Sequence, residues 1–169
     1  PHPSSPQTNA LNGVNLCDAL LHESALEAVQ AMGISTIRLT PDRWEATDGI
    51  FLIGNTDRYK ELNATDLRTL RTTLDVAHRL GLRVIISMRS LPGLRWSDDP
   101  TTPPDTRFWT QKTFQDQAVA FWSDLAAEIG THPAVAALDP LHAPKPLLAT
   151  QGLTDPTSDN FAQAVATTR

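Results

Sequence analysis

The sequence is informative first for what it has little of. Of its 169 residues one is a cysteine, Cys17, so no internal disulfide can form; this is compatible with the cytosol and does not exclude export. No apolar run approaches the roughly 18 residues that a membrane-spanning helix needs. Basic residues number 14 against 19 acidic ones, and the net charge of −5 argues against a nucleic-acid partner, because phosphate binding usually needs a basic surface.

Signatures of metal and cofactor binding are also missing. The five histidines, at positions 2, 22, 78, 132 and 142, are scattered, and no His/Cys cluster has the spacing of a metal site. No glycine-rich phosphate loop follows the first predicted strand, so the usual signature of a dinucleotide-binding sheet is lacking. We therefore expect neither a metal ion nor an organic cofactor.

What is present is typical of one globular domain. Apolar residues make up 40% of the chain, enough to bury a core. Residues 1–10 are predicted to be a flexible lead-in, since positions 1–9 are rich in Pro and Ser and lack apolar periodicity. Such a start fits an exported protein whose signal peptide has been removed as well as it fits a linker. We expect a secreted or periplasmic protein, with a cytoplasmic location as the alternative.

From residue 11 onward, short apolar segments alternate with longer segments of helical periodicity. Strands are predicted at 11–16, 35–39, 82–88 and 134–138, and helices at 24–32, 67–77, 114–129 and 160–168. Ser24 and Glu27 have the spacing of a capping box at the start of the first helix, and Gly33 and Gly81 follow the first two helices as stop signals. The polar stretches 40–63 and 91–105 are predicted to be surface loops.

This alternation predicts a parallel sheet with right-handed crossovers, in the α/β class. An open doubly wound sheet and a (β/α) barrel both satisfy the pattern. Because the long loops follow strands and the turns from helix to strand are short, the barrel is favoured. Four βα units over residues 11–169 are half of a (β/α)8 barrel. We expect the other half to be missing from this chain, with a dimer of half-barrels or an open sheet as alternatives.

The strands and the segments after them carry a series of short motifs. These are GVNL at 13–16, TIRLTP at 36–41 followed by Trp44, LRVII at 82–86, LPG at 91–93 and HPAV at 132–135. In their order and spacing they resemble the N-terminal half of glycoside hydrolase family 5, the cellulase-like (β/α)8 hydrolases. The resemblance implies a barrel that acts on, or binds, an oligo- or polysaccharide.

The chain departs from that family where its catalytic acid would stand. The family's fourth strand ends in Asn-Glu-Pro, with the Glu as acid/base, whereas the matching positions here are His142, Ala143 and Pro144. The family's nucleophile, a Glu on the seventh strand, would lie past Arg169. Retaining hydrolysis needs two carboxyl groups about 5 to 5.5 Å apart, and alanine can neither donate nor accept a proton. We therefore expect no catalytic residue in this chain, and a protein that binds carbohydrate or has a structural role without hydrolysis.

Two other functions stay open. One is an active polysaccharide hydrolase of endo-glucanase or mannanase type, whose second half and replacement acid lie elsewhere. Within the chain Glu45, Asp98, Asp99 or His142 could supply an acid, although a solvated surface role is the simpler expectation for the three carboxylates. The other is a half-barrel that associates with a second copy of itself.

Six residues are expected to bind the substrate. They are Asn15, Arg38, Arg89 and His142 near the strand ends, and Trp44 and Trp96 in loops. Aromatic faces can stack on sugar rings, although loop packing would also explain both tryptophans. Two guanidinium groups facing one cavity favour an anionic sugar such as a uronate, or an anionic partner loop, unless each has a structural role, such as Arg38 pairing with an acidic neighbour inside the barrel. Asp139 is expected to make a structural hydrogen bond there.

Overall fold

The structure, a computed structural model, describes residues 12–17, 23–40, 50–96 and 105–142. In chain order the elements are β1 (Gly13–Cys17), α1 (Glu23–Ala31), β2 (Thr36–Thr40), α2 (Ala64–Arg79), β3 (Arg83–Ser87), α3 (Arg107–Thr110), α4 (Lys112–Ile129) and β4 (Val135–Asp139). The predicted lead-in and the predicted helix at 160–168 lie outside these residues, as do Trp44, Glu45, Asp98, Asp99, Ala143 and Pro144.

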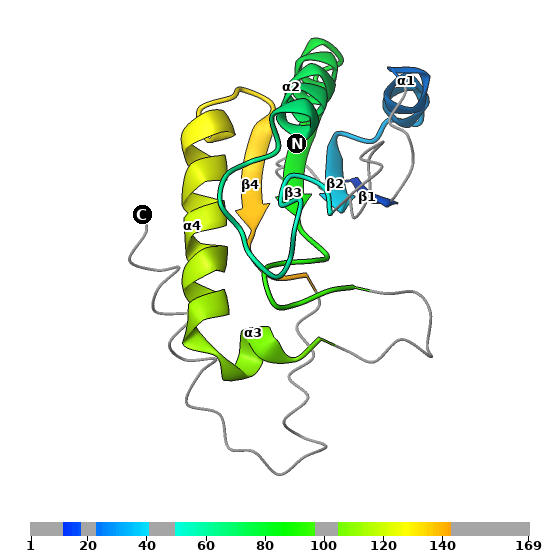
Figure 1. Cartoon of the computed structure of the whole chain (residues 1–169). Helices are drawn as coiled ribbons and strands as arrows, with labels where there is room; N and C mark the ends of the chain where they lie inside the picture. Colours follow the sequence, from blue (N-terminus) through cyan, green and yellow to red (C-terminus); the bar gives the residue numbers. More distant parts are fainter. Residues whose placement is uncertain (1–11, 18–22, 41–49, 97–104, 143–169) are drawn as a thin grey trace, which may run out of the picture.

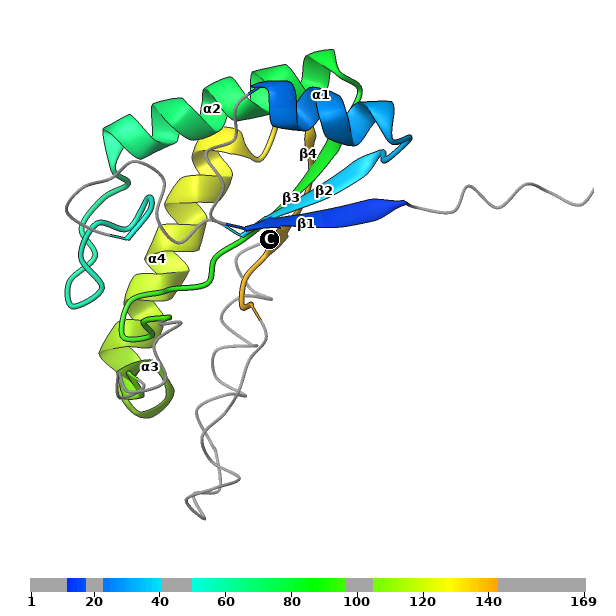
Figure 2. The same ribbon diagram turned by 90° about the vertical axis from the view of Figure 1, so that its right-hand side faces the viewer.

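The described strands form one parallel sheet in the order β1-β2-β3-β4. Each strand pairs with the next one along the chain, so every crossover moves in the same direction across the sheet. Because crossovers of this kind are right-handed, all of their helices fall on one face, and Figures 1 and 2 show α1, α2 and α4 there. A doubly wound sheet would reverse its strand order and place helices on both faces. The predicted barrel topology is therefore confirmed.

The other face of the sheet is the one that a closed barrel would enclose. No described helix covers it (Figure 2), and Asn15 of β1 and Ala137 of β4 are exposed there. Arg38 and Ile85 lie between them in register, on β2 and β3. In a complete (β/α)8 barrel such side chains would fill the interior. The described residues thus form half of a barrel, as predicted.

The core lies between the sheet and the helices. Ile37 and Leu39 of β2 and Val84 and Ile86 of β3 have no exposed surface, whereas the alternating Ile85 is half-buried on the opposite face. The helices contribute fully buried side chains to the same cluster: Leu70, Leu74 and Ala77 from α2, and Ala118, Phe121 and Leu125 from α4. Burial of each large apolar side chain contributes about 1.5–3 kcal/mol, which holds the helices on this face.

Local sequence explains where the helices end, but one predicted helix start is wrong. Gly33 and Gly81 have φ of 75° and 70° and end α1 and α2, as predicted. At the start of α2, the Asn63 side chain accepts hydrogen bonds from the backbone N–H of Thr65 and Asp66 at 3.0 and 3.1 Å. The predicted capping box of α1 is wrong, because the helix already begins at Glu23 and Ser24 lies inside its first turn.

The loop after β2 is not a surface loop in its second part, contrary to prediction. Ile50, Phe51, Leu52 and Ile53 are at most 4% exposed and belong to the core cluster. Leu52 has a positive φ of 64°, and its backbone N–H donates to Oδ2 of Asp66 at 2.9 Å. Burial raises the pKa of Asp66, and the hydrogen bond from Leu52 opposes that rise. An apolar run within a polar stretch therefore joins the core cluster and is tied to the first turn of α2.

Candidate functional site

Polar side chains join three neighbouring strands at or near their carboxyl ends. Arg38 of β2 makes an ion pair with Asp139 of β4, and its Nη2 donates to Oγ of Ser87, of β3, at 3.0 Å. The Ser87 hydroxyl in turn donates to Oδ2 of Asp139 at 2.9 Å. The side chains of Arg38 and Asp139 are 27% and 28% exposed, so the pair is largely shielded from water. We call these three residues the strand-end triad.

The triad keeps Asp139 ionised. Partial burial alone would raise the pKa of Asp139, but hydrogen bonds from Arg38 and Ser87, the charge of Arg38 and the Leu141 backbone outweigh burial and lower it. A carboxyl group with a lowered pKa is a poor proton donor near neutral pH. Asp139 thus makes the kind of hydrogen bond that the sequence predicted for it. The sequence allowed Arg38 either to bind a ligand or to pair with an acidic neighbour, and the structure contains the pair with Asp139. Ligand binding by Arg38 stays a prediction.

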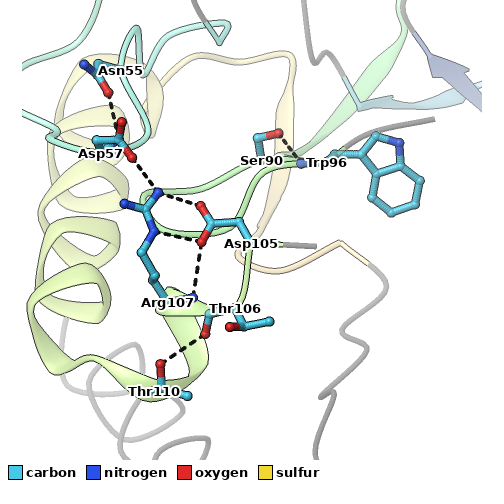
Figure 3. A network of polar contacts seen from close by, with 8 residues as sticks. All are labelled: Asn55, Asp57, Ser90, Trp96, Asp105, Thr106, Arg107 and Thr110. Carbon is cyan, nitrogen blue, oxygen red and sulfur yellow. Dashed lines mark hydrogen bonds and ion pairs between the residues drawn. The ribbon is translucent and has the colours of Figure 1, made fainter. Parts of the chain in front are cut away.

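A second cluster lies in the segments that follow β3 and β4. The guanidinium carbon of Arg89 is 4.5 Å from the ring centroid of Trp96, a cation–π distance. The rings of Trp96 and His142 meet edge to face, with centroids 5.8 Å apart and planes at 77°. The backbone N–H of Trp96 donates to Oγ of Ser90 at 2.9 Å, which holds the start of the indole side chain (Figure 3). Three of the predicted site residues are thus brought together.

His142 carries an unmet hydrogen-bonding atom in this cluster. Its Nδ1 is buried and has no hydrogen-bond partner in the described part of the chain. Burial lowers the pKa of His142, and the charges of Arg38 and Arg89 lower it further, while Asp139 opposes the change. The imidazole is therefore neutral near pH 7, which argues against His142 as a replacement for the catalytic acid.

Of the remaining predicted site residues, one lies in the described part of the chain and the others lie outside it. Asn15 is exposed on β1 and is the register partner of Arg38, so the two share the uncovered face of the sheet. Trp44 and Ala143 lie outside the described residues. Sequence reasoning missed Ser87, whose hydroxyl completes the strand-end triad. The available signal was a polar residue that follows the apolar run at 84–86 at the end of the strand, directly before the predicted site.

The described residues carry no sign of a metal site or of a membrane-spanning helix. No group of three or more His, Cys, Asp or Glu side chains there could hold a metal ion. None of the helices in the same part of the chain is long and apolar enough to cross a bilayer.

Comparison with known proteins identifies the fold. No family model matches the chain, and no curated protein sequence does. Among solved structures, endoglucanase Cel5A from Pseudomonas stutzeri matches with a TM-score of 0.61 and 20% identity, over 94% of this chain and 47% of that one. An endogalactoceramidase matches with a TM-score of 0.68 and 18% identity, over 94% and 45%. A variant GH5_18 protein from Bifidobacterium longum, in complex with Manβ1-4GlcNAc, matches with a TM-score of 0.65 and 16% identity, over 94% and 40%.

These likenesses concern the fold. The chain spans about half the length of the first solved chains that it matches. At such low identity the similarity shows that the described half-barrel has the fold of glycoside hydrolases of family 5 type. The resemblance inferred from the sequence motifs is confirmed at that level.

Proposed function

We propose that this chain is part of a glycoside-hydrolase-like barrel that binds an oligo- or polysaccharide at the carboxyl edge of its sheet without hydrolysing it. The observation that carries the proposal is the cluster of Arg89, Trp96 and His142 beside the strand-end triad. In barrels of this kind, ligands bind at the face built from the strand-to-helix loops, where this cluster lies.

The chemistry of the cluster suits a sugar. A pyranose ring has an apolar face for an indole and hydroxyl groups around its rim, and Trp96 offers an amphipathic ring held in place by two neighbours. The buried Nδ1 of His142 has no hydrogen-bond partner among the described residues, and a buried polar atom without one costs about 1–3 kcal/mol. A sugar hydroxyl can donate to or accept from that nitrogen, so ligand binding would recover this cost.

The same residues support binding without hydrolysis. Asp139 is ionised and engaged by Arg38 and Ser87, and His142 is neutral. Ala143 stands where the resembled family has its acid/base Glu, and a methyl group transfers no proton. Of the described side chains at this edge, neither Asp139 nor His142 is therefore suited to donate a proton to a leaving oxygen.

The charge balance favours a neutral ligand. Asp139 compensates the charge of Arg38, one of the two guanidinium groups on which an anionic sugar was expected. We therefore propose a neutral β-linked oligosaccharide as the ligand, with an oligouronate as the comparison. Tighter binding of the oligouronate would restore the anionic alternative.

Calorimetric titration of the 169-residue chain with β-1,4-linked gluco- and manno-oligosaccharides tests the proposal. Trp96→Ala and Arg89→Ala should each weaken binding by about tenfold, the loss of a central contact of about 1–2 kcal/mol. Arg83→Ala is the matched control, because Arg83 lies at the other end of β3 and should leave affinity unchanged. Release of reducing ends would favour the active-hydrolase alternative instead. If the folded chain binds none of these oligosaccharides, a structural role remains as the explanation.

The uncovered face of the sheet favours a second candidate, a half-barrel that pairs with a second copy. Asn15 and Ala137 are exposed on that face, and two copies with four strands each would restore the eight of a closed barrel. Sedimentation equilibrium distinguishes this candidate, because it requires a dimer with no free monomer. A monomeric, folded chain would contradict it.

A further inference from the structure

A network of charged side chains joins the two loops on the carboxyl side of the sheet. Arg107, the first residue of α3, donates from Nε and Nη2 to the two carboxylate oxygens of Asp105, at 2.9 and 2.8 Å. Its Nη2 also forms an ion pair with Asp57, which follows β2 (Figure 3). The backbone N–H of Asp57 donates to Oδ1 of Asn55 at 2.7 Å. The fork of one guanidinium thus spans two loops that are 50 residues apart in sequence.

The backbone of the same segments clamps Gly93 between them. The N–H of Gly93 donates to the carbonyl of Thr56, and the N–H of Phe108 donates to the carbonyl of Gly93, both at 2.9 Å. Thr56 directly precedes Asp57, and Phe108 directly follows Arg107. The ion pair and the backbone hydrogen bonds therefore tie together the same segments.

Gly93 belongs to the turn that leads to Trp96. Leu91 and Leu94 pair across this turn through two backbone hydrogen bonds of 2.8 Å. Gly93 has a φ of 71°, and a Cβ there would lie 2.5 Å from Cγ of Phe114. The guanidinium carbon of Arg107 is 4.7 Å from the centroid of that phenyl ring. The turn thus rests on Phe114 and is held at Gly93 by both neighbouring segments.

We propose that Arg107 is a positioning residue for the carbohydrate site, acting through the turn that carries Trp96 and not through contact with the ligand. The inference rests on the proposed function, because Trp96 is the residue that it places. Loss of the Arg107–Asp57 ion pair releases one of the two segments that clamp Gly93. The indole of Trp96 then loses its fixed orientation. The side chains of Arg107 and Asp57 are 37% and 66% exposed, so solvent screens the pair and added salt weakens it.

Fluorine NMR of the full chain labelled with fluorotryptophan tests the positioning directly. The Trp96 resonance is assigned by its absence in Trp96→Phe. Arg107→Gln and Asp57→Asn should each shift and broaden this resonance and weaken oligosaccharide binding about threefold, the scale of a solvent-exposed ion pair. The double variant should lose no more than Arg107→Gln alone, because the two residues act as one pair.

Arg71→Gln is the matched control. It breaks the ion pair of Arg71 with Glu128, whose side chains are 48% and 42% exposed, and it should leave the Trp96 resonance and the affinity unchanged. An unmoved Trp96 resonance in folded Arg107→Gln or folded Asp57→Asn overturns the inference. A shifted resonance in those variants, with no sugar binding by the unmodified chain, supports the positioning and overturns the proposed function alone.

Discussion

Asp139→Asn tests whether the strand-end triad is held by charge. The amide has nearly the same shape as the carboxylate and can still accept the hydrogen bond from Ser87, but it removes the negative charge facing Arg38. Ion pairs on the surface contribute about 0.2–1 kcal/mol, whereas breaking a buried pair costs about 3–5 kcal/mol. With 27% and 28% of the two side chains exposed, the Arg38–Asp139 pair lies between these cases. We expect a loss of about 2 kcal/mol in the free energy of unfolding near neutral pH.

The effect should depend on pH in a defined direction. The pKa of Asp139 is lowered in the folded state, so the ionised carboxylate stabilises the fold at every pH above 3.8, the ordinary pKa of aspartate. That contribution disappears as the pH falls through the lower, folded-state pKa. The difference in stability between the unmodified chain and Asp139→Asn should therefore be largest near neutral pH and should shrink in acid.

Urea unfolding followed by far-ultraviolet circular dichroism, in neutral and in acidic buffer, measures both quantities. Lys112→Gln provides the control, since the Lys112–Asp116 pair within α4 is 76% and 62% exposed and should contribute no more than about 0.5 kcal/mol. Equal destabilisation by Asp139→Asn in the two buffers would refute the reasoning, because the cost would then come from packing and not from charge.

Three further outcomes are expected. Gly93→Ala should cost about 1–3 kcal/mol more than Gly54→Ala, because φ is positive at both, 71° and 70°, but only at Gly93 would a Cβ meet the Phe114 ring; equal costs in urea unfolding would show that the ring moves aside. Phe51→Ala should lower the free energy of unfolding by about 3–5 kcal/mol although Phe51 lies in a loop, and a loss below about 1 kcal/mol would place it outside the core. Calorimetry should show that the affinity for sugar falls as the pH drops below 6.5, the ordinary pKa of histidine, because protonation of His142 adds a cation beside Arg38 and Arg89. His142→Gln should remove this pH dependence. A pH-independent affinity in the unmodified chain would contradict the prediction.

Regular elements could be predicted because their signals are local. Leu70, Leu74 and Ala77 recur at helical spacing, and all three are buried on one side of α2. Gly81 ends that helix because a positive φ suits a residue without a side chain. The predicted strands differ from the observed ones by one or two residues at their ends, where hydrogen bonds to the neighbouring strand decide the boundary.

The loop at 50–53 could not be predicted because its partners are distant in sequence. Four apolar residues are too few to show a period, and the polar stretch around them is typical of a surface loop. Their burial depends on the other members of the core cluster and on Asp66 of α2, which accepts a hydrogen bond from the backbone N–H of Leu52.

The site divides in the same way. Arg89, Trp96 and His142 could be chosen from the sequence, because their residue types and places after predicted strands suit a ligand at the carboxyl edge. The contacts that these and neighbouring side chains make could not be predicted. Ser87 joined to Asp139, and Arg107 joined to Asp57, come from different elements whose spacing follows from packing.

By itself the sequence determined the alternation of strands and helices and the presence of an alanine at position 143, and it favoured the half-barrel topology, because periodicity, stop signals and residue identity are carried locally along the chain. Only the tertiary structure decided that Arg38 is neutralised by Asp139, that Nδ1 of His142 has no hydrogen-bond partner in the described part of the chain, and that the turn bearing Trp96 is clamped by two loops. Those properties depend on distances between segments separated by many residues, and such distances exist only after the sheet and its helices have packed.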